Sequence, residues 1–241
     1  MSRSNLIVLL TFMLNSFTVC SVMAQSYSDK IKDNGSLRID HIVVAASDLN
    51  KGSKQIKDIT GVDTVFGGLH PGGTQNSLIS LGPQTYLEVL APQEKNKVPK
   101  LAEWLLPFDH ATPMRFAVST KDIKTTKSWL QKHGYHTTDL KPGGRTLPNG
   151  DTLMWTSMTI KDPVINGSPF FIQWDKRSPH PAATSPIGCE FHSLMVISSQ
   201  SDELETLFNI LGLEIIVENL DGRNPTMQVL LDCPKGRVQL K

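Results

Sequence analysis

Two polar residues stand out because each lies alone in a hydrophobic run. His41 precedes four apolar residues (42–45), and Glu88 stands between Leu87 and Val89. Such runs are typical of buried β-strands. A buried carboxylate is costly unless a partner, a ligand or a metal compensates it. His41 and Glu88 are therefore our candidate catalytic residues. The alternatives are a hydrogen-bonded core histidine and a carboxylate that only forms an ion pair.

A loop rich in glycine and proline lies between these two residues. It runs from Gly67 to Gly73 and carries His70, and Thr74 and Asn76 follow it. Such loops adopt special backbone angles and often carry functional side chains. We expect His70, Thr74 and Asn76 to bind a substrate, and the alternative is a turn whose polar groups bond only to their own backbone. Four further histidines lie in linkers or at element ends, where we expect them to be solvated: His110, His133, His136 and His180.

Three segments of similar size would position these residues. Each begins with an apolar strand, enters a helix at a capping residue, and leaves that helix at Gly61, Gly134 or Gly212. Short β-rich runs follow each helix. The expected caps are Asp48 in the first segment, Thr120 or Asp122 in the second, and Ser199 or Ser201 in the third.

This order predicts three βαβββ modules, over residues 37–92, 112–175 and 188–241, with a linker helix over 101–108. Three helices with about a dozen short strands predict an α+β fold. We expect curved mixed sheets around a cup-shaped site.

The N-terminus has the features of a signal peptide. Arg3 supplies a positive charge, residues 6–14 are apolar, and Val22 and Ala24 are small residues suited to cleavage after Ala24. The apolar run is shorter than the roughly 20 residues that span a bilayer. We therefore expect a secreted or periplasmic protein with a cleaved signal over 1–24, a disordered lead-in over 25–36 and no stable membrane span.

The remaining composition limits the partners. The 241 residues carry a net charge of +1 without a Lys/Arg cluster, which gives no electrostatic basis for binding nucleic acid. A small-molecule ligand or substrate is the expected partner. Removal of the signal leaves Cys189 and Cys233, which in an oxidising compartment could form a disulfide. Two unpaired cysteines are the alternative.

Five runs resemble the glyoxalase-like branch of the vicinal oxygen chelate superfamily. The resemblance covers residues 37–175 closely and 189–240 only as a repeated pattern of elements. It implies a cup built from paired modules, which members also pair across a homodimer. It further implies a divalent metal in the cup, with Zn, Fe, Ni, Co or Mn as candidates. The matching runs are Leu37–Val43, Gly67–Asn76, Tyr86–Glu88, Arg145–Trp155 and Pro169–Asp175.

The resemblance also implies which positions would hold the metal. Members of the superfamily take their ligands from the first and the last strand of each module. These positions hold His41 and Glu88 in the first module, Arg115 and Gln173 in the second, and His192 and Gln239 in the third.

Two pairings of the modules follow from these positions. Pairing of modules one and three would give a metal site of His41, Glu88, His192 and Gln239. Pairing of modules one and two, which chain adjacency favours, would place Arg115 against Glu88. That ion pair would make the site selective for anions.

Three residues of the second module are further candidates for binding. Arg145 and Trp155 suit an anionic or planar group, and the alternative is a surface arginine and a core tryptophan. Gln173, between Ile172 and Trp174, is expected to face the cup.

The resemblance implies an exported enzyme that acts on a small oxygenated molecule. The reaction would be an isomerisation, a lyase step or a ring-opening oxygenation, with Glu88 as base or metal ligand. The alternative is a non-catalytic protein that sequesters a small molecule in the cup. A purely structural exported domain is a third hypothesis.

Overall fold

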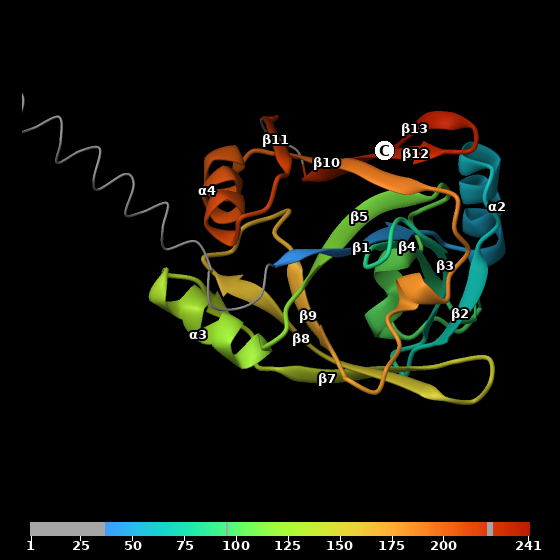
Figure 1. The fold of residues 1–241 in the computed structure, drawn as a ribbon, viewed down its shortest axis with the longest axis horizontal. Helices are drawn as coiled ribbons and strands as arrows, with labels where there is room; N and C mark the ends of the chain where they lie inside the picture. Colours follow the sequence, from blue (N-terminus) through green and yellow to red (C-terminus); the bar gives the residue numbers. More distant parts are fainter. Residues whose placement is uncertain (1–36, 95, 221–223) are drawn as a thin grey trace, which may run out of the picture.

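The structure is a computed structural model that describes residues 37–94, 96–220 and 224–241 (Figure 1). The expected signal peptide over 1–24 and lead-in over 25–36 lie outside these residues. Within the described ranges, no helix is both long and apolar enough to cross a membrane.

Each part of the chain has one strand, one α-helix and then several further strands. This order confirms the expected α+β class. The first part contains β1 (Arg38–Ala45), α2 (Leu49–Thr60), β2 (Val65–Leu69), β3 (Thr74–Ser80), β4 (Tyr86–Pro92) and the 3-10 helix η1 (Lys100–Leu105). The middle part contains β5 (Thr112–Ser119), α3 (Ile123–Lys132), β6 (His136–Thr137), β7 (Lys141–Thr146), β8 (Thr152–Asp162), β9 (Phe170–Trp174) and the 3-10 helix η2 (Pro181–Ala183). The last part contains β10 (Glu190–Ser198), α4 (Ser201–Leu211), β11 (Ile216–Asn219), β12 (Thr226–Cys233) and β13 (Gly236–Leu240).

Eight strands of the first two parts form a closed barrel. The strand order is β6-β8-β7-β2-β3-β4-β1-β5-β9, and β8 also pairs with β9, which closes the ring and leaves β6 as an extension of β8 (Figure 1). The two parts meet along β1 and β5, which pair antiparallel, and along β2 and β7. The β2–β7 seam is held by one residue pair, Leu69 with Thr146. The first and second modules therefore pair within one chain.

Local capping explains where two of the helices begin. The Asp48 side chain accepts the Lys51 N–H at the start of α2, and Gly61 ends that helix with a φ of 83°. The Asp122 carboxylate accepts the N–H groups of Lys124 and Thr125 at the start of α3. These positions agree with the sequence, because short acceptor side chains satisfy the free N–H groups of a first turn.

Two other helix ends differ from the expectation. The helix α3 ends at His133, one residue before Gly134. Gln200 occupies the N-cap position of α4 without a side-chain capping bond, and Ser201 is the first helical residue. The first turn of α4 instead carries Asp202 and Glu203, which favour the positive end of a helix dipole.

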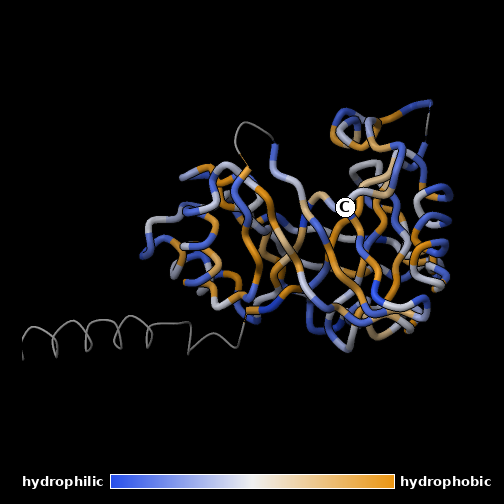
Figure 2. Tube along the Cα trace, turned by 90° about the horizontal axis from the view of Figure 1, so that it is seen from above, coloured by the Kyte–Doolittle hydropathy of each residue, from blue (hydrophilic) through white to orange (hydrophobic). Residues whose placement is uncertain are grey.

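The last part forms a separate sheet of order β11-β10-β12-β13 that packs on the outside of the barrel. Its helix contributes Phe208, whose ring meets that of Phe116 from β5 at 6.0 Å between centroids. The Lys235 ammonium donates to the Asp58 carbonyl at the end of α2. The buried apolar residues of barrel and sheet form one continuous cluster, and apolar residues (orange) fill the centre of Figure 2, with polar ones (blue) toward its edges.

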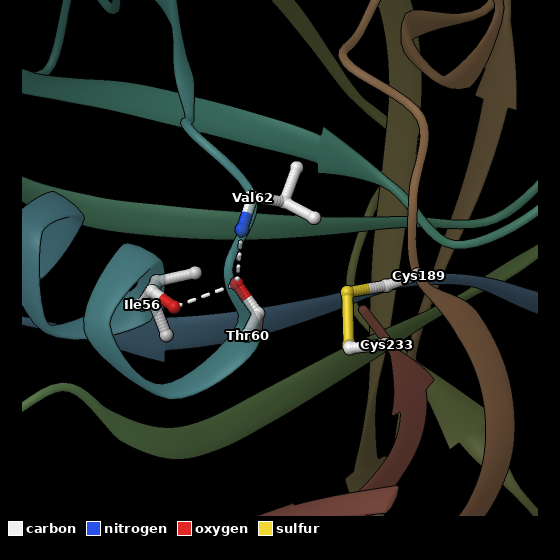
Figure 3. Close-up of a disulfide and its surroundings, with 5 residues drawn as sticks. All are labelled: Ile56, Thr60, Val62, Cys189 and Cys233. Carbon is white, nitrogen blue, oxygen red and sulfur yellow. Dashed lines mark hydrogen bonds between the residues drawn. A yellow bond between two sulfur atoms is a disulfide. The ribbon is translucent and has the colours of Figure 1, made fainter. Parts of the chain in front are cut away.

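A disulfide between Cys189 and Cys233 connects the start of β10 to the end of β12, which confirms the expected bond. Figure 3 shows it beside the last turn of α2. There the Thr60 hydroxyl donates to the Ile56 carbonyl and accepts the Val62 N–H. The bond thus lies where the C-terminal sheet meets the helix that covers the barrel.

Candidate active site in the barrel

The barrel encloses a cavity of about 620 Å³. Alternate side chains of its strands face inward, because successive residues of a strand point to opposite sides. Trp104 of η1 lines the cavity, and Ala102 and Leu105 of the same helix pack on Ala45. Ala182 of η2 packs on Tyr86 and Leu78 of the barrel. The cavity brings together seven of the predicted site residues: His41, His70, Thr74, Glu88, Arg115, Arg145 and Trp155.

Asp40 orients His41 from behind. Its carboxylate lies 2.7 Å from His41 Nδ1, and the side chain is fully buried. Strict alternation along a strand would turn Asp40 away from His41. The pairing of β1 with β5 has an irregularity between Ile39 and His41, and this β-bulge accounts for the proximity of the two neighbouring side chains.

Two further donors hold the same carboxylate. Trp174 donates from Nε1 to Asp40 Oδ2 at 3.2 Å, and His180 Nε2 lies 3.1 Å from that oxygen. His180 Nδ1 accepts the N–H of Ala182, so its proton must be on Nε2 and is donated to Asp40. His180 is therefore a partner of the site, and the expectation that it is solvated is wrong.

These hydrogen bonds also fix the charge of Asp40. Burial by itself would raise the pKa of this carboxyl group, but the hydrogen bonds from His180 and His41 outweigh that effect and lower the pKa from 3.8 to about 2. Ionised Asp40 can only accept hydrogen bonds, so Nδ1 of His41 carries a proton. The second nitrogen, Nε2, is thus the one that His41 presents to the cavity.

Glu88 is the second centre of the site. One of its oxygens lies 3.7 Å from His41 Nε2, and the other is 4.0 Å from His70 Nε2. Asn76 donates its amide N–H to Glu88 Oε1 at 2.5 Å. Asn76 is itself buried behind the cavity wall. In the structure, Asn76 therefore holds the Glu88 carboxylate in place and does not line the cavity.

The surrounding charges keep Glu88 ionised. Burial would raise its pKa, but the charges of His41 and His70, the Asn76 hydrogen bond and the charge of Arg145 together lower it below the usual range. The pKa of His70 is also lowered, but here burial is the cause, because burial disfavours the charged form of an imidazole. A carboxylate ionised at neutral pH thus lies beside two imidazoles.

The loop that carries His70 is held by several hydrogen bonds. His70 Nδ1 lies 2.9 Å from the Thr74 hydroxyl. The Gln93 amide donates to the carbonyls of His70 and Thr74, and Pro99 packs where a side chain on Gly73 would stand. These contacts fix the direction of the His70 ring, so the imidazole is positioned before any ligand binds.

Arg115 does not form the expected ion pair with Glu88. Among the described residues, the close partners of Glu88 are His41, His70 and Asn76, and the Arg115 guanidinium lies 5.6 Å from the Trp104 ring centroid. The physical reason is the sheet order: Glu88 and Arg115 both pair with Val43, from opposite sides. Two strand spacings, about 9.5 Å, therefore separate their backbones.

Gln173 does not face the cavity, and that expectation is wrong. Its side-chain oxygen accepts the N–H of Ile123 at the start of α3. The alternation of β9 explains this direction, because Phe170, Ile172 and Trp174 are the residues of that strand that line the cavity.

The residues present do not fit the four-ligand metal site of the superfamily. His192 and Gln239 lie on the C-terminal sheet, where His192 contacts Asp232 and Arg237 and Gln239 donates to Gln228. In the second module, the two ligand positions hold Arg115, which is a cation, and Gln173, which points away from the cavity. In the described ranges, no group of three or more His, Cys, Asp or Glu side chains is arranged to hold a metal ion.

Several site residues were not predicted from the sequence. Tyr86 stacks on His41 at 4.6 Å between ring centroids, and Trp174 meets Trp155 at 5.4 Å. Both belong to strands that were predicted, so the alternation of inward residues was a usable signal for them. Asp40 and His180 offered no such signal, because a bulge and a distant loop bring them together.

A family model described as a glyoxalase-like domain matches residues 39–211 of the chain. Among solved structures, a hypothetical protein from Staphylococcus aureus has a TM-score of 0.59 and 18% sequence identity, over 85% of this chain and 86% of that one. A methylmalonyl-CoA epimerase from Mycobacterium tuberculosis has a TM-score of 0.42 and 17% identity, over 61% of this chain and 91% of its own. The first of these likenesses supports the fold, and neither assigns an activity. No curated protein matches the chain in sequence.

Proposed function

The chain belongs to the glyoxalase-like domain family, as its motifs predict, and from this premise we propose that it is an enzyme that moves a proton on a small oxygenated molecule. The reaction class is that of an isomerase or a lyase. The observation that supports this proposal is the buried series Asp40–His41–Glu88 at the cavity wall, with 2.7 Å and 3.7 Å between its successive polar atoms. Two groups that exchange protons at one place are what such a reaction needs.

The step begins with a substrate that has a C–H bond next to a carbonyl group. Glu88 takes this proton, and the electrons of the C–H bond move into the carbonyl to give an enolate. His41, when protonated at Nε2, donates to the enolate oxygen and stabilises the developing charge. Return of the proton to another face or carbon completes an isomerisation without any further reactant.

The other polar residues position this pair. Asp40 keeps the His41 ring turned toward the cavity, and Asn76 keeps the Glu88 carboxylate in place. The low pKa of Glu88 keeps it ionised and ready to accept a proton, but it also makes Glu88 a weak base. The donor at His41 is therefore essential, because it makes the substrate carbon more acidic.

A non-catalytic binding protein is the second candidate. Its support is the aromatic lining of the cavity by Tyr86, Trp104, Trp155, Phe170 and Trp174. Such rings hold a planar ligand without any reaction.

The test is proton exchange in D₂O. The wild type is incubated with a panel of small ketones and keto acids, and loss of the α-proton signal is followed by NMR. We expect Glu88→Gln to lower the exchange rate by roughly 10²- to 10⁴-fold, the usual contribution of a general base. The matched control is Glu190→Gln, which alters an exposed glutamate of the C-terminal sheet and should leave the rate unchanged.

Exchange that persists in Glu88→Gln would contradict the assigned base. Binding of panel compounds without any exchange in the wild type would favour the sequestering protein.

We further propose that the protein is exported, with cleavage after Ala24. The support is the n-region, apolar run and small residues at the N-terminus, together with the Cys189–Cys233 disulfide, a bond typical of oxidising compartments. N-terminal sequencing of the mature protein should begin at Gln25; a chain that retains residues 1–24 would contradict export.

A further inference from the structure

Arg145 is a buried cation that forms no salt bridge or side-chain hydrogen bond with the residues that the structure describes. It lies on β7 and is 3% exposed. Its Nε has no hydrogen-bond partner, and within the described residues no carboxylate lies within salt-bridge distance of the guanidinium. Burial of an unpaired charge is strongly unfavourable. Ionised Glu88 offsets part of this charge from a distance, but the buried Nε–H is left without an acceptor, which favours an anionic ligand at the guanidinium.

The charge of Arg145 acts on the cavity. Burial lowers the pKa of His70, and the two histidines lower that of Glu88; the Arg145 charge adds to both shifts and opposes the rise that burial causes in the pKa of Tyr86. These three residues line the cavity, as Arg145 itself does. The chain also leaves room for the guanidinium, because a Cβ on Gly67 would lie 2.8 Å from Arg145 Nη1 and would collide with the Asn76 side chain. Gly67 of the glycine-rich loop therefore leaves room for the Arg145 guanidinium beside Asn76, the residue that donates to Glu88.

A planar wall adjoins this charge. Trp155 lies against Gly143, where a Cβ would collide with the indole Nε1, and its ring contacts Trp174 edge to face. Gly143 and Arg145 are two residues apart on β7, so they face the same side of the strand about 7 Å apart. The cavity thus offers the Arg145 cation beside an aromatic surface, whereas the other lining arginine, Arg115, lies over the Trp104 ring.

We propose that Arg145 binds the carboxylate of the substrate, and that the substrate class is a small monocarboxylate with a planar apolar body, such as an aryl keto acid. A guanidinium presents two parallel N–H groups that match the two oxygens of a carboxylate. A phosphate group would need several further donors near Arg145. Among the residues described, neither a lysine nor a helix N-terminus lines this cavity, and the second arginine, Arg115, lies over the Trp104 ring. The assignment rests on the proposed function for the reacting carbonyl, but the anion site itself can be measured without any reaction.

The experiment measures binding of an unreactive probe by calorimetry. The probe is 3-phenylpropanoate, which has the carboxylate and the ring but no ketone, and 3-phenylpropanamide is its neutral match. We expect the acid to bind the wild type roughly 10- to 100-fold more tightly than the amide, as for a charge-assisted hydrogen bond. Arg145→Met should remove this preference, whereas Glu88→Gln, which removes a negative charge from the same cavity, should not weaken it.

Arg177→Met is the control for position. Arg177 borders a second hollow that also touches Arg145 from outside the barrel, and it is exposed. Its substitution should leave the affinity for the acid unchanged. Weakened binding in Arg177→Met would place the anion in the outer hollow and overturn the proposal.

Thermal unfolding without ligand provides the second readout. Arg145→Met removes both the cost of a buried charge and its long-range attraction to Glu88, so its melting temperature should be close to that of the wild type. A clearly lower melting temperature would mean that Arg145 is structural and would overturn the proposal.

The binding experiment has further outcomes that decide the proposal. An unchanged preference for the acid in Arg145→Met would overturn it. Tighter binding of inorganic phosphate than of the acid would assign the site to phosphate instead. Arg145-dependent binding without proton exchange on any keto acid would refute the proposed function alone.

Discussion

The barrel and the C-terminal sheet carry the same pattern of residues in two different environments. His41 and Glu88 are as far apart in the sequence as His192 and Gln239, and each histidine stands on the first strand of a strand–helix–strand segment. Each also has an aspartate beside Nδ1: Asp40 at 2.7 Å and Asp232 at 3.3 Å. The two sites differ at the position on the fourth strand, where the barrel has Glu88 and the C-terminal sheet has Gln239.

Burial separates the two sites. The His41 side chain is 4% exposed and that of Asp40 is 0%, whereas the values for His192 and Asp232 are 41% and 43%. The second module closes over the first to form the barrel, but in the part of the chain that the structure describes no second sheet closes over the histidine of the C-terminal sheet. A histidine with an aspartate beside Nδ1 thus becomes part of a candidate active site only where another module excludes water. The reason is that the charges of such a pair interact more strongly in a low dielectric.

The largest effect should come from a matched pair of histidine variants. His41→Asn should lower the proton-exchange rate by roughly 10²- to 10⁴-fold, because it removes the acid that faces the enolate oxygen. His192→Asn should leave the rate unchanged, since His192 lies outside the cavity. The measurement is the same NMR exchange assay on the compound that the wild type turns over best. Equal losses in both variants would mean that the C-terminal sheet contributes to the site, and the comparison would fail.

Removal of the disulfide tests whether the two regions unfold together. The Cys189–Cys233 loop spans 44 residues, and loop closure predicts a loss of about 4 kcal/mol or less when both cysteines become alanine. All four tryptophans lie between residues 104 and 174, so tryptophan fluorescence reports on the barrel and its coverings. Because barrel and sheet share one apolar core, urea midpoints from fluorescence and circular dichroism should fall together.

The wild type under reducing conditions is the matched control, and it should behave as the double alanine variant does. A circular dichroism midpoint that falls alone would show that the C-terminal sheet unfolds independently. Loss of ligand binding in the folded variant would also contradict the comparison, because the bond lies outside the cavity.

Much of the fold was predictable because it depends on local patterns. Apolar and β-rich runs located most of the strands, and Asp48, Gly61 and Asp122 marked helix ends as expected. The cavity residues His41, His70 and Glu88 were predictable from the family motifs. Gln173 could have been assigned correctly, since the large residues on either side of it in β9 indicate that it points outward.

Other features depend on the barrel and left no local signal. His180 meets Asp40 across 140 residues of sequence, through a loop whose direction no periodicity sets. Asp40 turns toward His41 only because of a bulge. Arg115 and Glu88 are separated because β1 lies between their strands, and strand order is a property of the whole sheet.

The smallest effect concerns acid stability, and it compares the two aspartates. The pKa of Asp40 is lowered from 3.8 to about 2 in the folded protein. A lowered pKa means that its contribution is present above pH 4 and is lost as the pH falls toward 2. Nearly two pKa units correspond to about 2 kcal/mol of unfolding free energy. Asp40→Asn should therefore be less stable than the wild type at pH 6, and the difference should shrink by about that amount near pH 2.

Asp232→Asn is the matched variant on the C-terminal sheet. The Arg237 hydrogen bond also lowers the pKa of Asp232, but this carboxylate is exposed, and solvent screens an exposed pair. Urea unfolding from pH 6 to pH 2 should thus show a pH-dependent difference for Asp40→Asn and almost none for Asp232→Asn. Equal pH dependence in both variants would mean that burial is not what distinguishes the two histidine–aspartate pairs, and the argument for the barrel site would lose its physical basis.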